Sequence, residues 1–229
     1  MFVPYLEIEQ IRAHTDEARR LYHRARGKQE IYPLDGQDFC ERVLGLSTHY
    51  DEQGVINRQH GEGIIGCLFP DRQPSPWGKD RLIVVNLTAT DTFDPTTRNQ
   101  TFTILHEGMG HYVLHFLKQV TEQTLQGAAF CRDIGVPSPP KSRLEWQADR
   151  AAAELMMPPD RVTWLLDGKQ PPEIINLDLY ASPLIGYFGA NRTMIETRLT
   201  SLGYRTINAC HSWAEWRPED THVTRPTPQ

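Results

Sequence analysis

The sequence predicts an α+β fold, in which a small, mainly antiparallel sheet packs on a helix and a helical C-terminal region follows. Three observations lead to it. Residues 5–26 carry apolar positions at helical spacing and residues 35–46 favour a second, short helix; residues 47–88 contain short β-branched runs between turn residues; and helical patterns return after residue 97. We expect one domain over residues 1–160, a helical subdomain over 161–208 and a disordered tail over 209–229.

Composition argues against several classes of protein. The 229 residues are 39% hydrophobic and 23% charged, and the formal net charge of −5 argues against broad binding to nucleic acid. No apolar run approaches the roughly 18 residues that a membrane span needs. The N-terminus has no basic leader before an apolar block, so we expect a cytoplasmic protein. The four cysteines form no C-x-x-C pair, so any metal would be bound by histidines and carboxylates.

The first half of the chain is expected to contain two helices and three strands. Residues 5–26 form an amphipathic helix that ends at Gly27, and residues 35–46 form a second, short helix. The strands are expected within THYDEQG (48–54), EGIIGCLFP (62–70) and DRLIVVNLT (80–88). The third strand is either an ordinary buried strand or a sheet edge on which an extended substrate adds as another strand.

The second half is expected to be helical. One helix runs from about residue 98 to 121 or beyond, a proline-rich loop covers 135–142, and a further helix covers 142–157 before two prolines. The remainder up to Gly203 is helical in pattern, and Asn191 is expected to cap its last helix.

The stretch FTILHEGMGHYVLH (102–115) contains a pair of histidines with unusual spacing. The familiar zinc-binding pattern H-E-x-x-H places its histidines four apart, whereas His106 and His111 are five apart. On a regular α-helix they would point about 140° apart and could not bind one ion. A single π-type bulge would restore a common face, and Gly108 and Gly110 would allow the backbone to distort there.

A second pairing exists within the same segment. His111 and His115 are four residues apart, and Glu107 lies four residues before His111, so all three share one face of an α-helix. This set could also hold a metal. It would make Glu107 a ligand instead of a general base.

A catalytic zinc site needs a third ligand from the protein, and the segment RLEWQADRAAAELMMP offers one. Glu145 and Asp149 lie one helical turn apart, so Glu145 can bind the metal while Asp149 hydrogen-bonds the far nitrogen of a ligand histidine. Glu154 competes for either role. The alternative is a solvated helix face, in which these carboxylates pair with Arg143 and Arg150.

Together the two segments resemble the ImmA/IrrE family of zinc metallopeptidases. Its members carry F-T-x-A-H-E-x-G-H-x-x-x-H, followed by E-x-x-A-[ND]-x-F-A-A-x-L-[LM]-M-P. The matching residues are Phe102, Thr103, His106, Glu107, Gly110, His111, His115, Glu145, Ala148, Asp149, Ala152, Ala153, Leu155, Met157 and Pro158. The departures are one extra residue within the first motif and Ala151 in place of phenylalanine. The inserted form HEGMGH is similar to the H-E-x-x-G-H of the dipeptidyl peptidase III family.

The resemblance covers about residues 10–205 and implies a zincin-like active-site helix in a metallopeptidase-like domain, with a helix-turn-helix-like C-terminal end. It implies that His106, His111 and Glu145 bind Zn²⁺, or alternatively Mn²⁺, and that Glu107 is the catalytic glutamate. Further donors to the reaction centre could be Tyr112, His115, Arg150 or Tyr180.

The resemblance also implies a protein substrate, namely a helix-turn-helix transcriptional repressor whose cleavage switches on a stress or mobile-element response. Two alternatives remain. In one, the insertion alters the metal site and the protein is a non-catalytic, protein-binding regulator. In the other, the protein binds DNA itself, but the helix-turn-helix-like segment offers only Arg192, Arg198 and Arg205 as basic residues, which argues against direct DNA binding.

Overall fold

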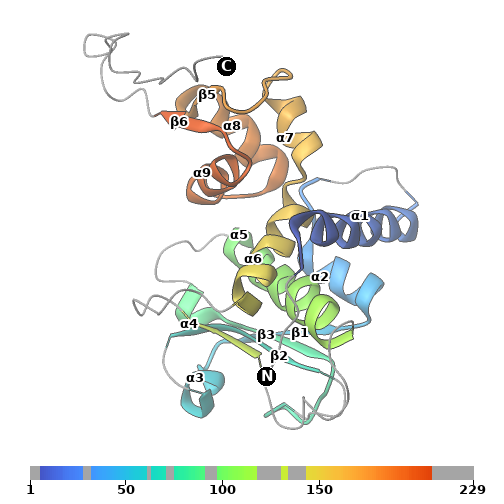
Figure 1. Ribbon diagram of the computed structural model, residues 1–229. Helices are drawn as coiled ribbons and strands as arrows, with labels where there is room; N and C mark the ends of the chain where they lie inside the picture. The colour runs from blue at the N-terminus through green and yellow to red at the C-terminus, as the bar shows by residue number, and fades with distance from the viewer. Residues whose placement is uncertain are drawn as a thin grey trace.

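The computed structural model describes residues 6–27, 32–60, 63–70, 75–90, 97–117, 130–133 and 143–207. Its architecture is α+β, as predicted. A four-stranded sheet lies at one end, helices cover one of its faces, and the C-terminal helices lie beyond them (Figure 1). Across the described ranges, no helix is both long and apolar enough to cross a lipid bilayer.

Two helical segments precede the sheet. Helix α1 (Ile8–Ala25) buries Ile11, Ala18 and Tyr22 on one face, in agreement with the predicted amphipathic helix. The short α2 (Gly36–Phe39) starts where the Asp35 carboxylate accepts a hydrogen bond from the Asp38 amide, and it continues as the π-helical turn η1 (Cys40–Leu44). This pair corresponds to the second predicted helix.

The sheet contains the three predicted strands and a fourth that the sequence did not indicate. The strands are β1 (Ser47–Asp51), β2 (Ile64–Phe69), β3 (Leu82–Asn86) and β4 (Phe130–Asp133), in the order β1-β3-β2-β4. The β1–β3 pairing is parallel, and the β2–β3 and β2–β4 pairings are antiparallel. The sheet is therefore mainly antiparallel, as expected.

Strand β3 is not an edge strand, so the alternative in which a substrate adds to it is wrong. It lies between β1 and β2, and all five of its residues are buried. A continuous run of apolar residues is typical of a strand covered on both faces, which is the position that Leu82–Asn86 occupies.

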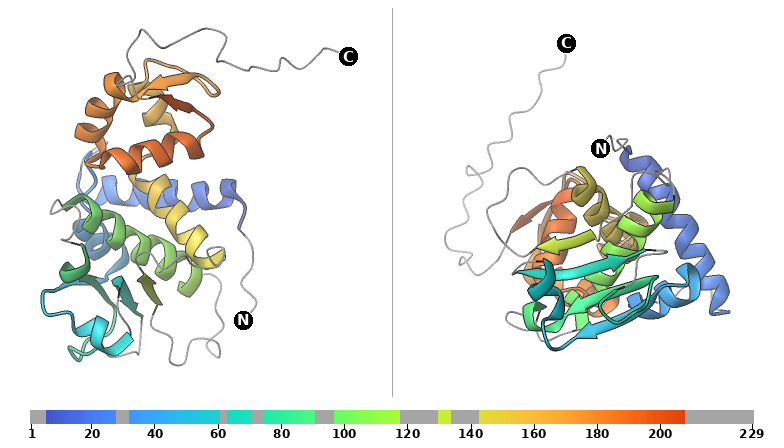
Figure 2. Two further views of the ribbon diagram at one scale, coloured as in Figure 1. Left: turned by 90° about the vertical axis from the view of Figure 1, so that its left-hand side faces the viewer. Right: turned by 90° about the horizontal axis from the view of Figure 1, so that it is seen from below.

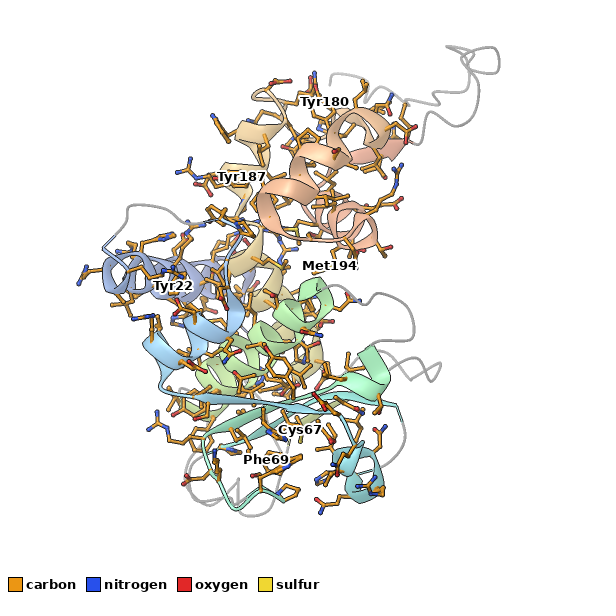
Figure 3. All side chains as sticks on the ribbon, turned by 180° about the vertical axis from the view of Figure 1, so that it is seen from behind. Tyr22, Cys67, Phe69, Tyr180, Tyr187 and Met194 are labelled. Carbon is orange, nitrogen blue, oxygen red and sulfur yellow. The ribbon has the colours of Figure 1, made fainter. Side chains whose placement is uncertain are left out.

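The two faces of the sheet belong to different clusters of apolar side chains. Leu68, Ile83 and Val85 face the main core under the helices. The opposite face carries a smaller cluster beneath α3 (Val55–His60), and its members are Ile56, Ile64, Cys67, Phe69, Leu82 and Val84. Figure 3 labels Cys67 and Phe69 on this side. A further short helix, α4 (Leu87–Thr90), follows β3 directly.

Two helices carry the motifs singled out in the sequence. Helix α5 (Thr97–Leu105) runs without a break into the π-helix η2 (His106–Leu117), and α6 (Arg143–Met156) packs against α1, α5 and η2. Figure 2 shows α6 leading from the level of the sheet toward the C-terminal helices. The expected loop at 135–142 lies outside the described residues, and so does the end, near residue 121, of the helix expected to begin at about residue 98.

The C-terminal region contains helices and a small parallel β-pair. Its elements are α7 (Pro159–Leu165), β5 (Ile174–Asn176), α8 (Leu177–Phe188), α9 (Arg192–Ser201) and β6 (Arg205–Ile207). Strand β5 was expected to be helical, but its Ile-Ile pair favours an extended backbone and pairs with β6. Asn191 caps α9 as predicted, because its side chain accepts a hydrogen bond from the Met194 amide at 2.9 Å. The expected tail at 209–229 lies outside the described residues.

Candidate metal centre

The inserted residue is accommodated by a π-helix. In this conformation the backbone hydrogen bonds join residues five apart, so residues with that spacing lie on the same side of the helix. The π-helix η2 extends over twelve residues instead of a single bulge. Nε2 of His106 therefore lies 3.1 Å from Nε2 of His111, and both rings are fully buried.

The two glycines of the motif allow close packing in addition to lying within the π-helix. Neither Gly108 nor Gly110 has a positive φ, so neither supplies a backbone conformation reserved for glycine. A Cβ atom on Gly108 would lie 2.5 Å from Sγ of Cys40, and one on Gly110 would lie 2.5 Å from Cα of Ala148 in α6.

Glu145 completes a group of three metal-ligand side chains. Its Oε2 lies 3.2 Å from Nε2 of His106, and its Oε1 lies 3.3 Å from Nε2 of His111. In a tetrahedron with ligand bonds of about 2.0 Å, the ligand atoms are about 3.3 Å apart. The three side chains could therefore hold one metal ion without further movement of the backbone.

The donor set and its exposure fit a metal ion that keeps one open coordination position. Two imidazoles and one carboxylate occur in catalytic zinc sites, which leave a fourth position for water or substrate. The side chain of Glu145 is 32% exposed, whereas those of His106 and His111 have no exposed surface. Solvent therefore reaches the group from the side of Glu145.

Each of the two histidines has a partner at its far nitrogen. Nδ1 of His106 lies 2.9 Å from Oδ1 of Asp149, the contact expected for Asp149. Nδ1 of His111 lies 3.1 Å from Nδ1 of His115, whose Nε2 in turn lies 3.2 Å from Oε1 of Gln147. His115 thus lies behind His111 and outside the group of three.

Burial and hydrogen bonding favour the ionisation states that bind metal. Burial raises the pKa of Glu145, but its polar contacts with the rings of His106 and His111 outweigh burial and hold the pKa well below its ordinary value. Burial lowers the pKa of His111. Burial and the nearby His111 lower the pKa of His115 to about 4. At neutral pH, Glu145 is ionised and His111 is neutral, as a metal ion requires.

Glu107 follows His106 directly in the chain and is fully buried. Its side chain faces strand β2, since a Cβ atom on Gly66 would lie 3.1 Å from Oε1 of Glu107. The alternative set of His111, His115 and Glu107 is not among the potential metal-binding groups of the described residues. Glu107 is therefore not a member of the group of three.

Three of the other candidate residues have partners elsewhere. The ring of Tyr112 stacks on Phe116, with its centroid 5.4 Å from that of Phe116. Arg150 pairs with Glu154 at 2.8 Å. Tyr180, labelled in Figure 3 within the C-terminal region, donates a hydrogen bond to Asp167.

Glu154 also lies away from the metal group, so it does not compete with Glu145 or Asp149. Its carboxylate accepts two hydrogen bonds from Arg198 of α9, at 3.0 and 2.8 Å. Arg150 and Arg12 contact the same carboxylate at 2.8 and 3.2 Å. The ion pairs join helices α1, α6 and α9.

Gln147 is a residue of this site that the sequence did not reveal. It lies two positions after Glu145, and side chains two apart on an α-helix do not share a face. Spacing arguments therefore select Glu145 and Asp149 and pass over Gln147. The property that marks Gln147 is the burial of its polar amide, which only the structure shows.

No protein-family model matches the chain, and no curated protein matches it either.

Proposed function

We propose that the protein is a zinc-dependent endopeptidase of the gluzincin type. The observation that carries the proposal is the convergence of His106, His111 and Glu145 within 3.1–3.3 Å of one another, with the buried Glu107 next to His106 in the chain. The imidazole and carboxylate donors favour zinc, and manganese is the alternative metal.

A zinc ion held by these residues supplies Lewis acidity, which polarises a substrate carbonyl and makes water a stronger nucleophile at neutral pH. Glu107 accepts the proton that a water molecule releases as it attacks the peptide carbonyl, and it passes this proton to the leaving amine. Asp149 orients the ring of His106 through the contact at 2.9 Å. The burial of Glu107 protects it from bulk water.

The proposed substrate is a specific protein, such as a helix-turn-helix transcriptional repressor, whose cleavage starts a stress or mobile-element response. The two motifs that resemble the ImmA/IrrE family support this choice of substrate. The same motifs support a hydrolase over a non-catalytic regulator. The π-helix supports it as well, because histidines five residues apart can face one ion in that conformation.

The charges on the C-terminal helices support a protein substrate over direct DNA binding. Arg198 is buried and paired with Glu154, and Arg192 pairs with Asp178 at 2.8 Å. These two arginines are therefore already engaged with carboxylates. A DNA-binding surface needs several cations that can neutralise phosphates.

The test compares the wild-type protein with Glu107→Gln, which removes the general base and keeps the three metal ligands. Both proteins are loaded with zinc and incubated with a lysate of the organism that encodes the wild-type protein. New protein N-termini are then mapped by mass spectrometry. We expect a small set of new N-termini with the wild type and none with Glu107→Gln at equal zinc content. The same set from both proteins, or none from the zinc-loaded wild type, would contradict the proposal.

A further inference from the structure

We infer that His115 and Gln147 are positioning residues, which fix the tautomer and the ring orientation of His111 through a neutral chain of hydrogen bonds. The inference rests on the proposed function, because it takes Nε2 of His111 as a metal ligand. The chain consists of two contacts, from Nδ1 of His111 to Nδ1 of His115 and from Nε2 of His115 to Oε1 of Gln147, at 3.1 and 3.2 Å.

The positions of the protons in this chain follow from its two ends. A neutral His111 that presents the lone pair of Nε2 to a metal carries its proton on Nδ1. Nδ1 of His115 must then accept that hydrogen bond, so His115 carries its own proton on Nε2. This proton is donated to Oε1 of Gln147, a carbonyl oxygen that can only accept. One arrangement of protons therefore satisfies both contacts.

The two ligand histidines are supported in different ways. His106 contacts a carboxylate, Asp149, whose side chain is 22% exposed. His115 and Gln147 are 2% and 0% exposed, so the support of His111 is cut off from solvent. A carboxylate behind His111 would be an ionised group buried away from water, and burying such a charge costs free energy. A neutral histidine and amide perform the same orienting role without a second buried charge.

The first test exchanges the residue at the end of the chain and measures zinc affinity by competition with a fluorescent chelator. Gln147→Met keeps the shape of the side chain but removes the accepting oxygen, whereas Gln147→Glu keeps an accepting oxygen and adds a charge. If Gln147 only fills space, the variant with the apolar Met should bind zinc more tightly, because the position is buried. If Gln147 accepts the hydrogen bond from His115, the variant with Glu should bind zinc more tightly.

We expect Gln147→Met to bind zinc about 10–100-fold more weakly than the wild type, and Gln147→Glu to bind it at least tenfold more tightly than Gln147→Met. Equal affinities, or tighter binding by Gln147→Met than by Gln147→Glu, would overturn the inference. Met109→Leu is the matched control, because Met109 is a fully buried core residue of the same π-helix. It should bind zinc as the wild type does.

The second test needs no variant. Long-range ¹H–¹⁵N correlation spectra of the zinc-loaded wild-type protein report the tautomer of each histidine ring. We expect the proton on Nδ1 of His111 and on Nε2 of His115. A proton on Nδ1 of His115, or a cationic His115 ring, would overturn the inference.

Failure of this inference can be told apart from failure of the proposed function. A protein that cleaves a substrate but shows the opposite order of zinc affinities would contradict the role of His115 and Gln147 alone. A protein that shows the expected order and tautomers but generates no new N-termini would contradict the peptidase function alone.

Discussion

Gly110 of the π-helix lies directly against Ala148 of α6, so close that a Cβ atom on Gly110 would lie 2.5 Å from Cα of Ala148. This contact sets the distance between the two helices that carry the metal group. Ala148 lies between Glu145 and Asp149 in the sequence, and Gly110 directly precedes His111. Any change in the spacing of the two helices therefore moves Glu145 relative to the histidines.

Substitution of Gly110 by alanine is predicted to abolish high-affinity metal binding. The added methyl group would have to push α6 away from η2, because its neighbours are the backbone and Cβ of Ala148 and neither can rotate aside. We expect the folded protein to lose about 1–3 kcal/mol of stability from overpacking and to retain much less zinc after purification. Urea denaturation and metal analysis by mass spectrometry measure these effects.

Gly186→Ala is the matched control for this variant. Gly186 lies within α8, and a Cβ atom there would meet no other atom within 4 Å. The change should raise stability by up to about 1 kcal/mol, because alanine favours the helix over glycine. It should leave the zinc content unchanged. Equal zinc loss in both glycine variants would show that the contact with Ala148 does not set the site.

Asp149→Asn is predicted to weaken zinc binding about 10–100-fold without abolishing it. The carboxylate lies 2.9 Å from Nδ1 of His106, and the amide offers a neutral acceptor that holds the imidazole less strongly. Chelator competition at neutral pH measures the change. Asp160→Asn, at a carboxylate that is 59% exposed, serves as the control and should bind zinc normally. Wild-type affinity in Asp149→Asn would contradict the orienting role.

The ion pairs of Glu154 are predicted to make stability depend on pH. Burial raises the pKa of Glu154, but the hydrogen bond and charge of Arg198, with Arg150 and Arg12, hold the pKa below its ordinary value. A carboxyl group whose pKa is lower in the folded than in the unfolded state stabilises the fold above its unfolded pKa of about 4.3. This stabilisation is lost as the pH falls through the lower, folded-state pKa.

Glu154→Gln should therefore unfold more easily than the wild type at pH 7, by about 3 kcal/mol or more, because the buried Arg198 loses its counter-charge. The difference between the two proteins should shrink as the pH falls below about 4. Urea denaturation at pH 7 and at a pH below about 4 measures this difference in the free energy of unfolding. Glu17→Gln, which breaks an exposed pair with Arg20, should show no measurable change at either pH. A difference that does not depend on pH would contradict this account.

Local spacing was enough to predict the elements that carry the candidate site. The amphipathic α1, the three strands and the helix of Glu145 follow from periodicity and turn residues. Asp149 was expected near a ligand histidine because it lies one turn after Glu145, and it does contact His106. Residues close in sequence on one helix have positions that spacing alone determines.

Contacts between distant segments could not be predicted in the same way. The sequence indicated one bulge, whereas the π-helix covers twelve residues, and the glycines within it pack against Cys40 and Ala148. Strand β5 pairs with β6. Glu154 is paired with Arg198 of α9 and does not take part in the metal group. Each outcome depends on a partner many residues away, which tertiary packing supplies and local propensity does not.

The most direct test of the account is the metal content per chain of the purified protein after zinc loading, for the wild type and four alanine variants. We predict about one zinc ion per chain in the wild type and in His115→Ala, and almost none in His106→Ala, His111→Ala and Glu145→Ala. If His106→Ala keeps its zinc while His111→Ala and His115→Ala lose it, or if the wild type binds none, the assignment of the metal centre is wrong.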